Sequence, residues 1–255
     1  PEYRVEAWNL LSNDVSCLDG CIAPSHYFGT LMAERLSLEP EASKYHPNGI
    51  TTEGVFPAKE LPLPPSVGYL ARLCPLKGLD ILVDAFIGLK ESGKHEHLHL
   101  KIAGGMTDED VPFVEEQKSK LLRAGLNDCF SITPNISREE KFSFLKSLSI
   151  FSVPARYPEA FGLYVVEALL AGSPVVLPNT GAFPEIVEST RGGKLYDPSA
   201  SGAFTETLDE LLNDPQTTRS MGLKAHQAVL NTYSNEKLAK RLVDEVVSPL
   251  PVKQK

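Results

Sequence analysis

From Ser66 onward the sequence alternates short apolar segments with longer segments of helical periodicity, and this alternation constrains the fold more than any other feature. The short segments are rich in β-branched and aromatic residues, as strands are, whereas the longer ones repeat their apolar residues at helical spacing. The expected strands are SVGYLARL, HLHLKIAGG, CFSITP, IFSVPA, PVVLPN and GGKLYDP. Parallel strands need crossover helices of this kind. We therefore expect an α/β fold with a doubly wound parallel sheet.

Several residues that could bind a ligand directly follow the expected strands. Ligands of doubly wound sheets bind at the carboxyl ends of the strands. The candidates at these ends are Arg72, Gly104–Gly105, Pro134–Asn135 and the stretch from Pro154 to Glu159. Their convergence on one edge of the sheet predicts a single ligand site there.

The stretch PEAFGLYVVEALLAGSPVV, residues 158–176, carries the most specific signal. A helix is expected to begin near Gly162–Leu163, and it is apolar almost all round except at Glu167. Burying a polar group without a partner costs roughly 2–7 kcal/mol, so this lone carboxylate indicates a binding partner. A second carboxylate, Glu159, precedes the helix N-terminus, where free N–H groups favour anions. The pattern predicts a ligand with phosphate and hydroxyl groups, such as a nucleotide sugar.

Arg72 and Lys77 share the loop LARLCPLKG after the first expected strand of the sheet. A planar guanidinium and a compact ammonium suit two adjacent phosphates, although a solvated loop accommodates them equally well. Gly104–Gly105 indicates either close approach of a ligand or a turn. Arg156 could bind phosphate or pair with Glu159. Glu185 could reach the site or cap its own short helix, and the capping role is favoured.

Metal binding is disfavoured. The alternating His95, His97 and His99 have no carboxylate or cysteine pattern to complete a site. The acidic run Asp108–Asp110 lies at an expected helix start, where acidic side chains complement the helix dipole.

The net charge of −8 argues against nucleic-acid partners and against anionic membrane surfaces. No apolar run approaches the ~20 residues that span a bilayer, and we expect no signal peptide. The four cysteines lack C-x-x-C spacing, so we expect reduced thiols and a cytoplasmic location.

The motif E-x7-E within EAFGLYVVEALLAGSPVV resembles that of the retaining glycosyltransferases of family 4, also called group 1, which have the GT-B fold. The segments VGYLARLCPLKG, GAFPEIVE, PNGI and APSHYFGTLMAERL resemble the same family, in its order, over about residues 19–233. The resemblance implies two Rossmann-like domains, of which this chain is the C-terminal, donor-binding one. We expect residues 1–38 to be a remnant of the N-terminal acceptor domain, 39–65 a Pro-rich connector, 66–233 the nucleotide-sugar domain and 234–255 a helix and tail.

By the same resemblance, Arg72 and Lys77 bind the diphosphate, Glu167 binds the ribose and Glu159 contacts the donor sugar; Glu159, Arg72 and Lys77 are the expected catalytic residues. The remaining donor-site residues are the amides of Phe161, Gly162 and Leu163, the pair Gly104 and Gly105, and a base-lining loop of Pro134, Asn135 and Ile136. LARL replaces the commoner GRL but leaves Arg72 in register.

The implied reaction is transfer of a hexosyl group from a UDP-, GDP- or ADP-linked sugar to an unknown acceptor, with retention, without metal and without cofactor. The absent remainder of the N-terminal domain is the expected partner. Two alternatives stay open: a module that binds a nucleotide sugar without turning it over, and a nucleotide-sugar epimerase of GT-B type. A sugar phosphorylase is disfavoured because no pyridoxal-lysine context is evident.

Overall fold

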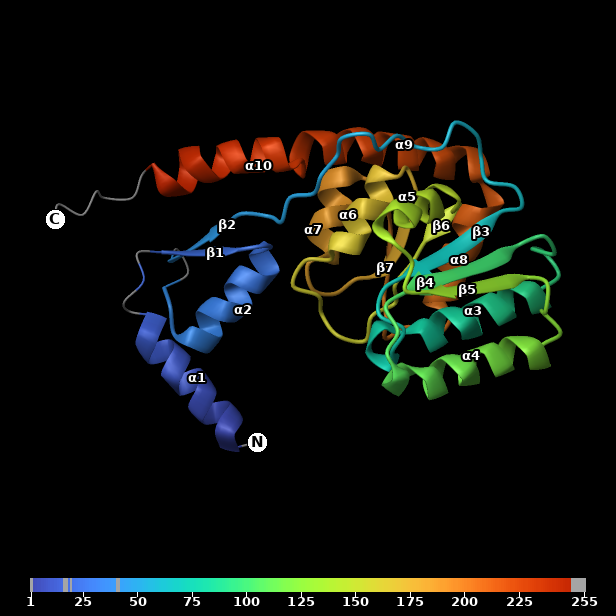
Figure 1. Cartoon of the computed structure of the whole chain (residues 1–255), viewed down its shortest axis with the longest axis horizontal. Helices are drawn as coiled ribbons and strands as arrows, with labels where there is room; N and C mark the ends of the chain where they lie inside the picture. The colour runs from blue at the N-terminus through green and yellow to red at the C-terminus, as the bar shows by residue number, and fades with distance from the viewer. Residues whose placement is uncertain (1, 16–17, 19, 40–41, 249–255) are drawn as a thin grey trace.

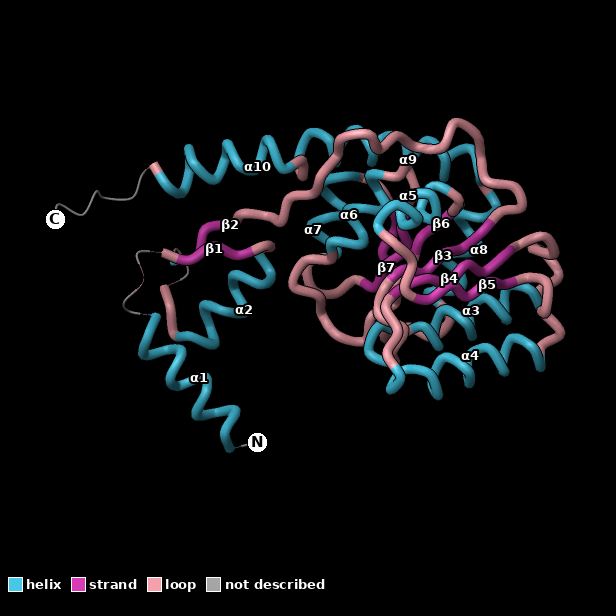
Figure 2. The backbone as a smooth tube through the Cα atoms, viewed as in Figure 1, coloured by secondary structure: helices cyan, strands magenta, loops and turns pink. Residues whose placement is uncertain are grey.

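A six-stranded parallel sheet forms the centre of the chain from Ser66 onward (Figures 1 and 2). The computed structural model describes residues 2–15, 18, 20–39 and 42–248. The strands are β3 (Ser66–Leu70), β4 (His99–Gly104), β5 (Phe130–Pro134), β6 (Ile150–Phe151), β7 (Val175–Pro178) and β8 (Gly193–Tyr196). Their spatial order is β5-β4-β3-β6-β7-β8, so the order reverses between β3 and β6. The expected doubly wound parallel sheet is confirmed.

Helices cover both faces of this sheet, with α3 and α4 on one side and α5, α6 and α9 on the other (Figure 1). Their bounds are α3 (Leu79–Glu91), α4 (Val111–Arg123), α5 (Arg138–Lys146), α6 (Leu163–Leu170), α7 (Phe183–Thr190), α8 (Ala203–Asn213) and α9 (Pro215–Thr232). Two short 3₁₀ turns, η2 (Pro75–Lys77) and η3 (Asp108–Asp110), precede α3 and α4. Every residue of β3 and β7 is buried, as expected of central strands covered on both faces.

Strand β6 is shorter than the segment IFSVPA predicts. Only Ile150 and Phe151 are in the sheet ladder, and Phe151 alone pairs with β7. Pro154 has no N–H to donate, so the chain leaves the sheet before it. The residues that follow form the loop that carries Glu159.

The N-terminal region consists of α1 (Glu2–Val15), β1 (Cys21–Ala23), α2 (His26–Leu36) and β2 (Ser43–Tyr45). β1 and β2 form a two-stranded parallel sheet, in which Ile22 faces Lys44 in register. β2 lies inside the segment 39–65 that the sequence indicates as a connector, so the ordered N-terminal unit reaches at least Tyr45. Cys17, one of the four predicted reduced thiols, lies outside the described residues, and the other three are free.

The final helix, α10 (Asn235–Leu242), continues into a π-helical turn, η4 (Val243–Val247), and runs over β1 and β2 (Figure 1). The Arg241 guanidinium donates to the Tyr45 carbonyl at 3.2 Å, and the Lys44 ammonium donates to the Glu245 carbonyl at 3.0 Å. The helix α10 and its π-helical extension therefore pack back onto the N-terminal region. Within the part of the chain that the structure describes, no helix is both long and apolar enough to cross a membrane.

Candidate functional site

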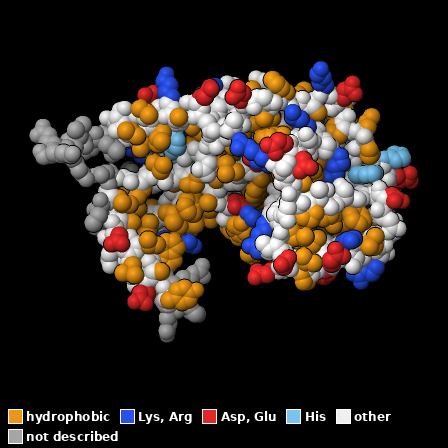
Figure 3. Space-filling view, in the orientation of Figure 1, with side chains coloured by type: hydrophobic (Ala, Val, Ile, Leu, Met, Phe, Trp, Pro, Cys, Tyr) orange, Lys and Arg blue, Asp and Glu red, His pale blue; other side chains and the backbone are white. Residues whose placement is uncertain are grey.

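The carboxyl ends of β3 and β6 flank the point where the strand order reverses, which is where doubly wound sheets bind ligands. The loop after β3 carries Arg72 and Lys77, and the loop after β6 carries Glu159. Figure 3 shows the surface hollowed between the region of α1 and α2 and the sheet domain, with basic and acidic side chains on the domain's side of the hollow.

Lys77 and Glu159 join these two loops. The Lys77 ammonium is hydrogen-bonded to Glu159 Oε1, and the Tyr164 hydroxyl donates to the same oxygen at 2.8 Å. The ammonium also lies over two aromatic rings, 4.9 Å from the centroid of Tyr157 and 5.2 Å from that of Tyr164. Glu159 is buried, and no hydrogen bond to its Oε2 is formed within the described residues. One carboxylate oxygen therefore holds the pair together while the other is free to accept.

The protonation of this cluster follows from its environment. Burial alone lowers the pKa of Lys77, but hydrogen bonds with Glu159 and Tyr157 outweigh burial, and the pKa is raised above its ordinary value. Burial, followed by the charge of Glu159, raises the pKa of Tyr164 far above its ordinary value. Lys77 is therefore a cation and Tyr164 a neutral hydroxyl donor at ordinary pH.

Arg72 is held along one edge by Asp110. Its Nε and Nη2 each lie 3.3 Å from an oxygen of that carboxylate. The Arg72 side chain is 55% exposed whereas that of Asp110 is 6% exposed, so the guanidinium stays accessible to an anion. Asp110 also completes a capping box with Thr107. The hydrogen bond from the Thr107 N–H is the main cause that lowers the pKa of Asp110, and Arg72 lowers this pKa further. The acidic run at residues 108–110 thus caps a helix, as predicted, and also positions Arg72.

Glu167 has a protein partner that sequence reasoning missed. Its Oε1 accepts a hydrogen bond from the Lys141 ammonium at 2.5 Å. The Glu167 side chain is 19% exposed, so it reaches the surface of the site. The expectation that this lone carboxylate needs a ligand as its partner is therefore wrong, because Lys141 already pairs with it. The pairing was missed because Lys141 lies on α5, a different helix that packs against α6.

The helix α6 begins where the sequence predicts. Gly162 precedes it with φ 108° and ψ 67°, a left-handed conformation that glycine adopts readily. Among the described residues, the amides of Phe161, Gly162 and Leu163 donate no hydrogen bond to another protein group. The N-terminus of α6 thus retains the free donors that an anion site requires.

Gly104 and Gly105 differ in what surrounds them. Gly104 has φ 142°, and a Cβ there would lie 1.7 Å from the Ala71 carbonyl oxygen. Its lack of a side chain is therefore required by the protein's own backbone. A Cβ on Gly105 would meet nothing within 4 Å, so this residue borders open space beside the Arg72 loop.

The loop of Pro134, Asn135 and Ile136 is tied to the loop after β4. Asn135 has φ 55°, and its side-chain amide accepts from the Met106 N–H at 2.9 Å and donates to the Met106 carbonyl at 3.1 Å. Pro134 ends β5, and Ile136 packs partly buried against the core. These contacts fix the loop at the carboxyl edge of the sheet.

The two residues left undecided by the sequence have other partners. Arg156 is bound by Asp80 through contacts of 2.5 and 2.7 Å, so the predicted alternative of pairing with Glu159 is wrong. Glu185 accepts from the N–H groups of His26 and Tyr27 at 2.9 and 2.7 Å. It caps α2 rather than its own helix, because the start of α7 faces the start of α2.

The N-terminal region reaches the site loop directly. The buried Ser25 hydroxyl donates to the Ala160 carbonyl at 2.7 Å, next to Glu159. Sequence reasoning missed this contact because the two residues are 135 positions apart.

Within the described residues, no group of three or more His, Cys, Asp and Glu side chains could hold a metal ion. The Nε2 atom of His95 lies 2.6 Å from a carboxylate oxygen of Asp209 on α8, so one member of the histidine run is hydrogen-bonded within the protein.

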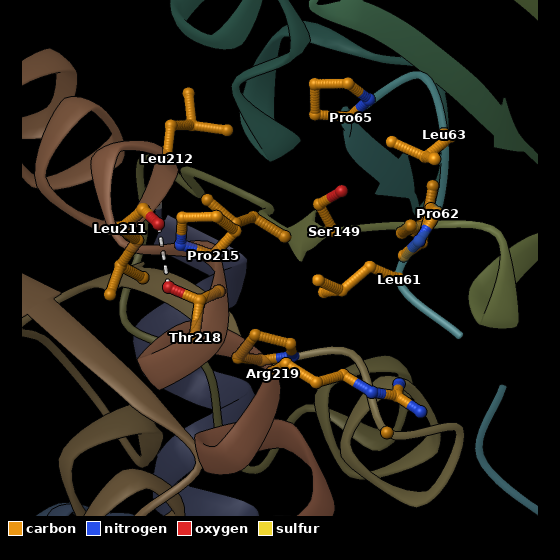
Figure 4. Close-up of a pocket in the computed structure, with 14 residues that line it drawn as sticks. Leu61, Pro62, Leu63, Pro65, Ser149, Leu211, Leu212, Pro215, Thr218 and Arg219 are labelled. Atoms are coloured by element: carbon orange, nitrogen blue, oxygen red, sulfur yellow. Dashed lines mark hydrogen bonds between the residues drawn. The ribbon is translucent and has the colours of Figure 1, made fainter. Parts of the chain in front are cut away.

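A cavity of about 200 Å³ lies at the opposite edge of the sheet (Figure 4). It is bounded by the connector at Leu61–Leu63 and by Pro215 at the start of α9, and Arg219 is the one charged residue in its wall. The Thr218 hydroxyl is already bonded to the Leu211 carbonyl at 2.7 Å. None of the predicted site residues borders this cavity.

The strand order and the ligand edge together define a Rossmann-like domain, the α/β class that places ligands at the reversal of strand order. Over residues 57–228 the chain matches the family described as glycosyl transferases, group 1, and it belongs to that family. The membership expected from the E-x7-E segment is confirmed.

Two curated relatives show the extent of the match. The D-inositol 3-phosphate glycosyltransferase of Corynebacterium efficiens is 29% identical over 165 residues, covering 65% of this chain and 38% of the relative. A GDP-mannose-dependent α-(1-6)-phosphatidylinositol monomannoside mannosyltransferase of Mycobacterium tuberculosis is 27% identical over 186 residues, covering 71% and 46%. The chain thus spans less than half the length of these relatives.

Solved structures share the fold. Sucrose-phosphate synthase from Thermosynechococcus elongatus superposes with a TM-score of 0.80 at 22% identity, covering 95% of this chain and 60% of that one. HepE from Anabaena, solved with UDP and glucose, gives 0.79 at 20% identity, covering 96% and 67%. The C-terminal domain of LpcC, a group 1 glycosyl transferase from Francisella tularensis, gives 0.65 at 24% identity, and the match covers 73% of this chain and all of that domain. These neighbours confirm the fold expected of the C-terminal half of a GT-B protein.

Proposed function

We propose that this chain is the donor half of a glycosyltransferase that binds a nucleotide-diphosphate sugar and transfers its hexosyl group to an acceptor. The observation that carries the proposal is the pair of Lys77 and Glu159, which joins the two loops at the reversal of strand order. A cation and a carboxylate in contact at this point suit a ligand that has both phosphates and hydroxyl groups.

The cations and the start of α6 would bind the diphosphate. The Arg72 guanidinium is anchored on one edge and exposed on the other. The Lys77 ammonium has three donors, so it can keep Glu159 and also bind a phosphate oxygen. The free amides of Phe161, Gly162 and Leu163 add donors aimed at an anion.

The two carboxylates would bind hydroxyl groups. Among the described residues nothing donates to Oε2 of Glu159 or of Glu167, so the first would accept from the donor sugar and the second from the ribose. The loop of Pro134, Asn135 and Ile136 would line the base. Gly105, with open space where a Cβ would lie, would let the nucleotide approach the backbone closely.

The reaction would proceed with retention. The bond from the anomeric carbon to the diphosphate breaks while the acceptor oxygen bonds to that carbon on the same face, and the acceptor's proton passes to the departing phosphate oxygen. Arg72, Lys77 and the α6 N-terminus would stabilise the charge that develops on the leaving diphosphate. These groups supply the positive charge from the protein itself, so we propose that no metal ion or cofactor is needed. A cytoplasmic location stays a prediction from the thiols.

The names of related proteins support this class of donor. HepE was solved with UDP and glucose, and the mycobacterial relative is described as GDP-mannose-dependent. A thermal-shift screen against UDP-, GDP-, ADP- and dTDP-sugars tests the proposal, because a ligand that binds only the folded form raises its melting temperature. Product linkage analysis with the whole enzyme tests retention; inversion at the anomeric carbon would contradict it.

A binding module without turnover is the second candidate, favoured by the match to less than half of the curated relatives' length. Binding of a nucleotide sugar without hydrolysis or transfer by this chain identifies the module. Release of a rearranged free sugar without any acceptor identifies an epimerase instead.

A further inference from the structure

Glu167 is held on one side by Lys141. The ammonium contacts Oε1 at 2.5 Å, whereas no hydrogen bond to Oε2 is formed within the described residues. The Lys141 and Glu167 side chains are 24% and 19% exposed, so both border the site surface without lying free in solvent. A carboxylate bonded at one oxygen loses rotational freedom about its last torsion and presents its other oxygen in a single direction.

Lys141 is itself fixed in place. It lies in the first turn of α5, which a capping box begins: Glu140 N–H donates to Ser137 Oγ at 3.2 Å, and Ser137 N–H donates to Glu140 Oε2 at 2.8 Å. The Lys141 ammonium also lies 5.4 Å from the centroid of the Phe142 ring, which favours a cation there. The helix follows directly on the loop of Pro134–Ile136.

The same arrangement recurs at the other carboxylate of the motif. Glu159 is held at Oε1 by Lys77, and its Oε2 is free of protein donors among the described residues. Each glutamate is thus bound by a lysine from another element and presents one oxygen. Lys77 belongs to the predicted phosphate loop, whereas neither the sequence motifs nor the family match assigns any role to Lys141.

We propose that Lys141 is a positioning residue for ribose recognition: by binding Oε1 of Glu167, it aims Oε2 at the ribose hydroxyls. This inference rests on the proposed function, because it takes the ligand to be a nucleotide. Lys141 acts through Glu167 and does not itself touch the ribose. Replacing Lys141 should therefore weaken the preference for a ribose over a sugar without hydroxyls only in a chain that retains Glu167.

The experiment compares the affinities of UDP, GDP and ADP with those of their 2′,3′-dideoxy analogues by calorimetry. The variants are Lys141→Leu, Lys141→Arg, Glu167→Gln and the double variant Glu167→Gln with Lys141→Leu. Lys146→Leu, at the other end of the same helix, is the matched control. Ligand-free melting temperatures identify any variant that is unfolded.

The wild-type chain is expected to bind the best ribonucleotide at least about tenfold more tightly than its dideoxy analogue, the scale of one charge-assisted hydrogen bond. Lys141→Leu is expected to reduce this ratio to about threefold or less, while Lys141→Arg, which keeps a donor to Oε1, retains most of it. The double variant is expected to match Glu167→Gln, and Lys146→Leu to match wild type.

A folded Lys141→Leu chain with the full ribose preference would overturn the inference, as would a further loss on adding Lys141→Leu to Glu167→Gln. In both of these outcomes the nucleotide site itself stands. If Glu167→Gln alone keeps the preference, the ribose role of Glu167 is wrong and the inference fails with it. If no nucleotide binds the wild-type chain, the proposed function fails first.

Discussion

Glu159 and Glu167 lie in one turn-and-helix segment, and Oε1 of each accepts a hydrogen bond from a lysine on another element, Lys77 and Lys141 respectively. The charges of the motif are therefore balanced within the protein. A ligand that binds here does not have to neutralise two bare carboxylates. In the proposed donor site, the ligand would supply hydroxyl groups to the two carboxylate oxygens that have no partner among the described residues, and phosphates to Lys77 and Arg72.

Gly104, the last residue of β4, and Gly105, which follows it, offer a matched pair of substitutions. Gly104→Ala places a Cβ 1.7 Å from the Ala71 carbonyl oxygen at a φ of 142°, so we expect it to lower the free energy of unfolding by about 2–3 kcal/mol. Gly105→Ala, where the Cβ meets nothing within 4 Å, should leave stability within about 0.5 kcal/mol of wild type. Urea denaturation measures both. Equal stabilities would contradict the backbone contact described for Gly104.

Gly105→Ala also tests the approach of a ligand. If the nucleotide lies against this backbone, the substitution weakens nucleoside diphosphate binding several-fold in a chain of unchanged stability. Unchanged affinity removes Gly105 from the donor site and leaves its neighbour with a purely structural role.

Alkaline pH should destabilise the protein through its buried hydroxyls. The pKa values of Tyr69 and Tyr164 are raised by burial, so the folded state holds these protons more tightly than the unfolded state does. Their contribution to stability is complete below the unfolded pKa of about 10 and is lost as pH rises above it. Lys77, whose folded pKa is also raised, acts in the same direction.

Tyr164→Phe should make the fall in the free energy of unfolding above pH ~10 less steep, because it removes one of these groups. Tyr3→Phe, at an exposed position, is the control and should not change the slope. Chemical denaturation at several pH values gives the slopes. A slope in Tyr164→Phe as steep as that of wild type would show that Tyr164 does not contribute to alkaline unfolding.

Glu185 should hold the N-terminal region against the sheet domain. Glu185→Gln replaces one acceptor of the His26 and Tyr27 N–H groups with a donor, so we expect a loss of about 1–2 kcal/mol at this contact. Hydrogen exchange at those two amides should accelerate, while Glu188→Gln, at an exposed position of the same helix, should not change it. Unchanged protection in Glu185→Gln would show that other contacts hold α2.

The periodicity of the sequence was enough to predict the sheet, the order of strands and helices, and the start of α6. These features depend on neighbours in the chain: apolar spacing, the Ser137–Glu140 capping box and Gly162 before Leu163. The length of β6 was overestimated, because the apolar run continues past the point where Pro154 ends the ladder.

The pairing of charges could not be predicted in the same way. Lys141 reaches Glu167 from another helix, Asp110 reaches Arg72 from the loop after the next strand, and Glu185 reaches α2 across the two regions of the chain. Each contact depends on where the fold places two elements that are distant in sequence. Motif spacing therefore predicted a set of candidate site residues, but not which of them are paired with other residues of the protein.

The most direct test of the donor site is calorimetry of Glu167→Gln and Glu159→Gln with UDP, GDP and ADP and with their hexose-linked forms, with Glu139→Gln at an exposed position as the control. We expect Glu167→Gln to weaken nucleoside diphosphate binding by about 1–3 kcal/mol, roughly 5- to 150-fold. Glu159→Gln should leave that affinity within about threefold and remove the additional affinity that the sugar provides. Two variants that bind nucleoside diphosphates and nucleotide sugars as the wild-type chain does would contradict the assignment of this edge of the sheet as the donor site.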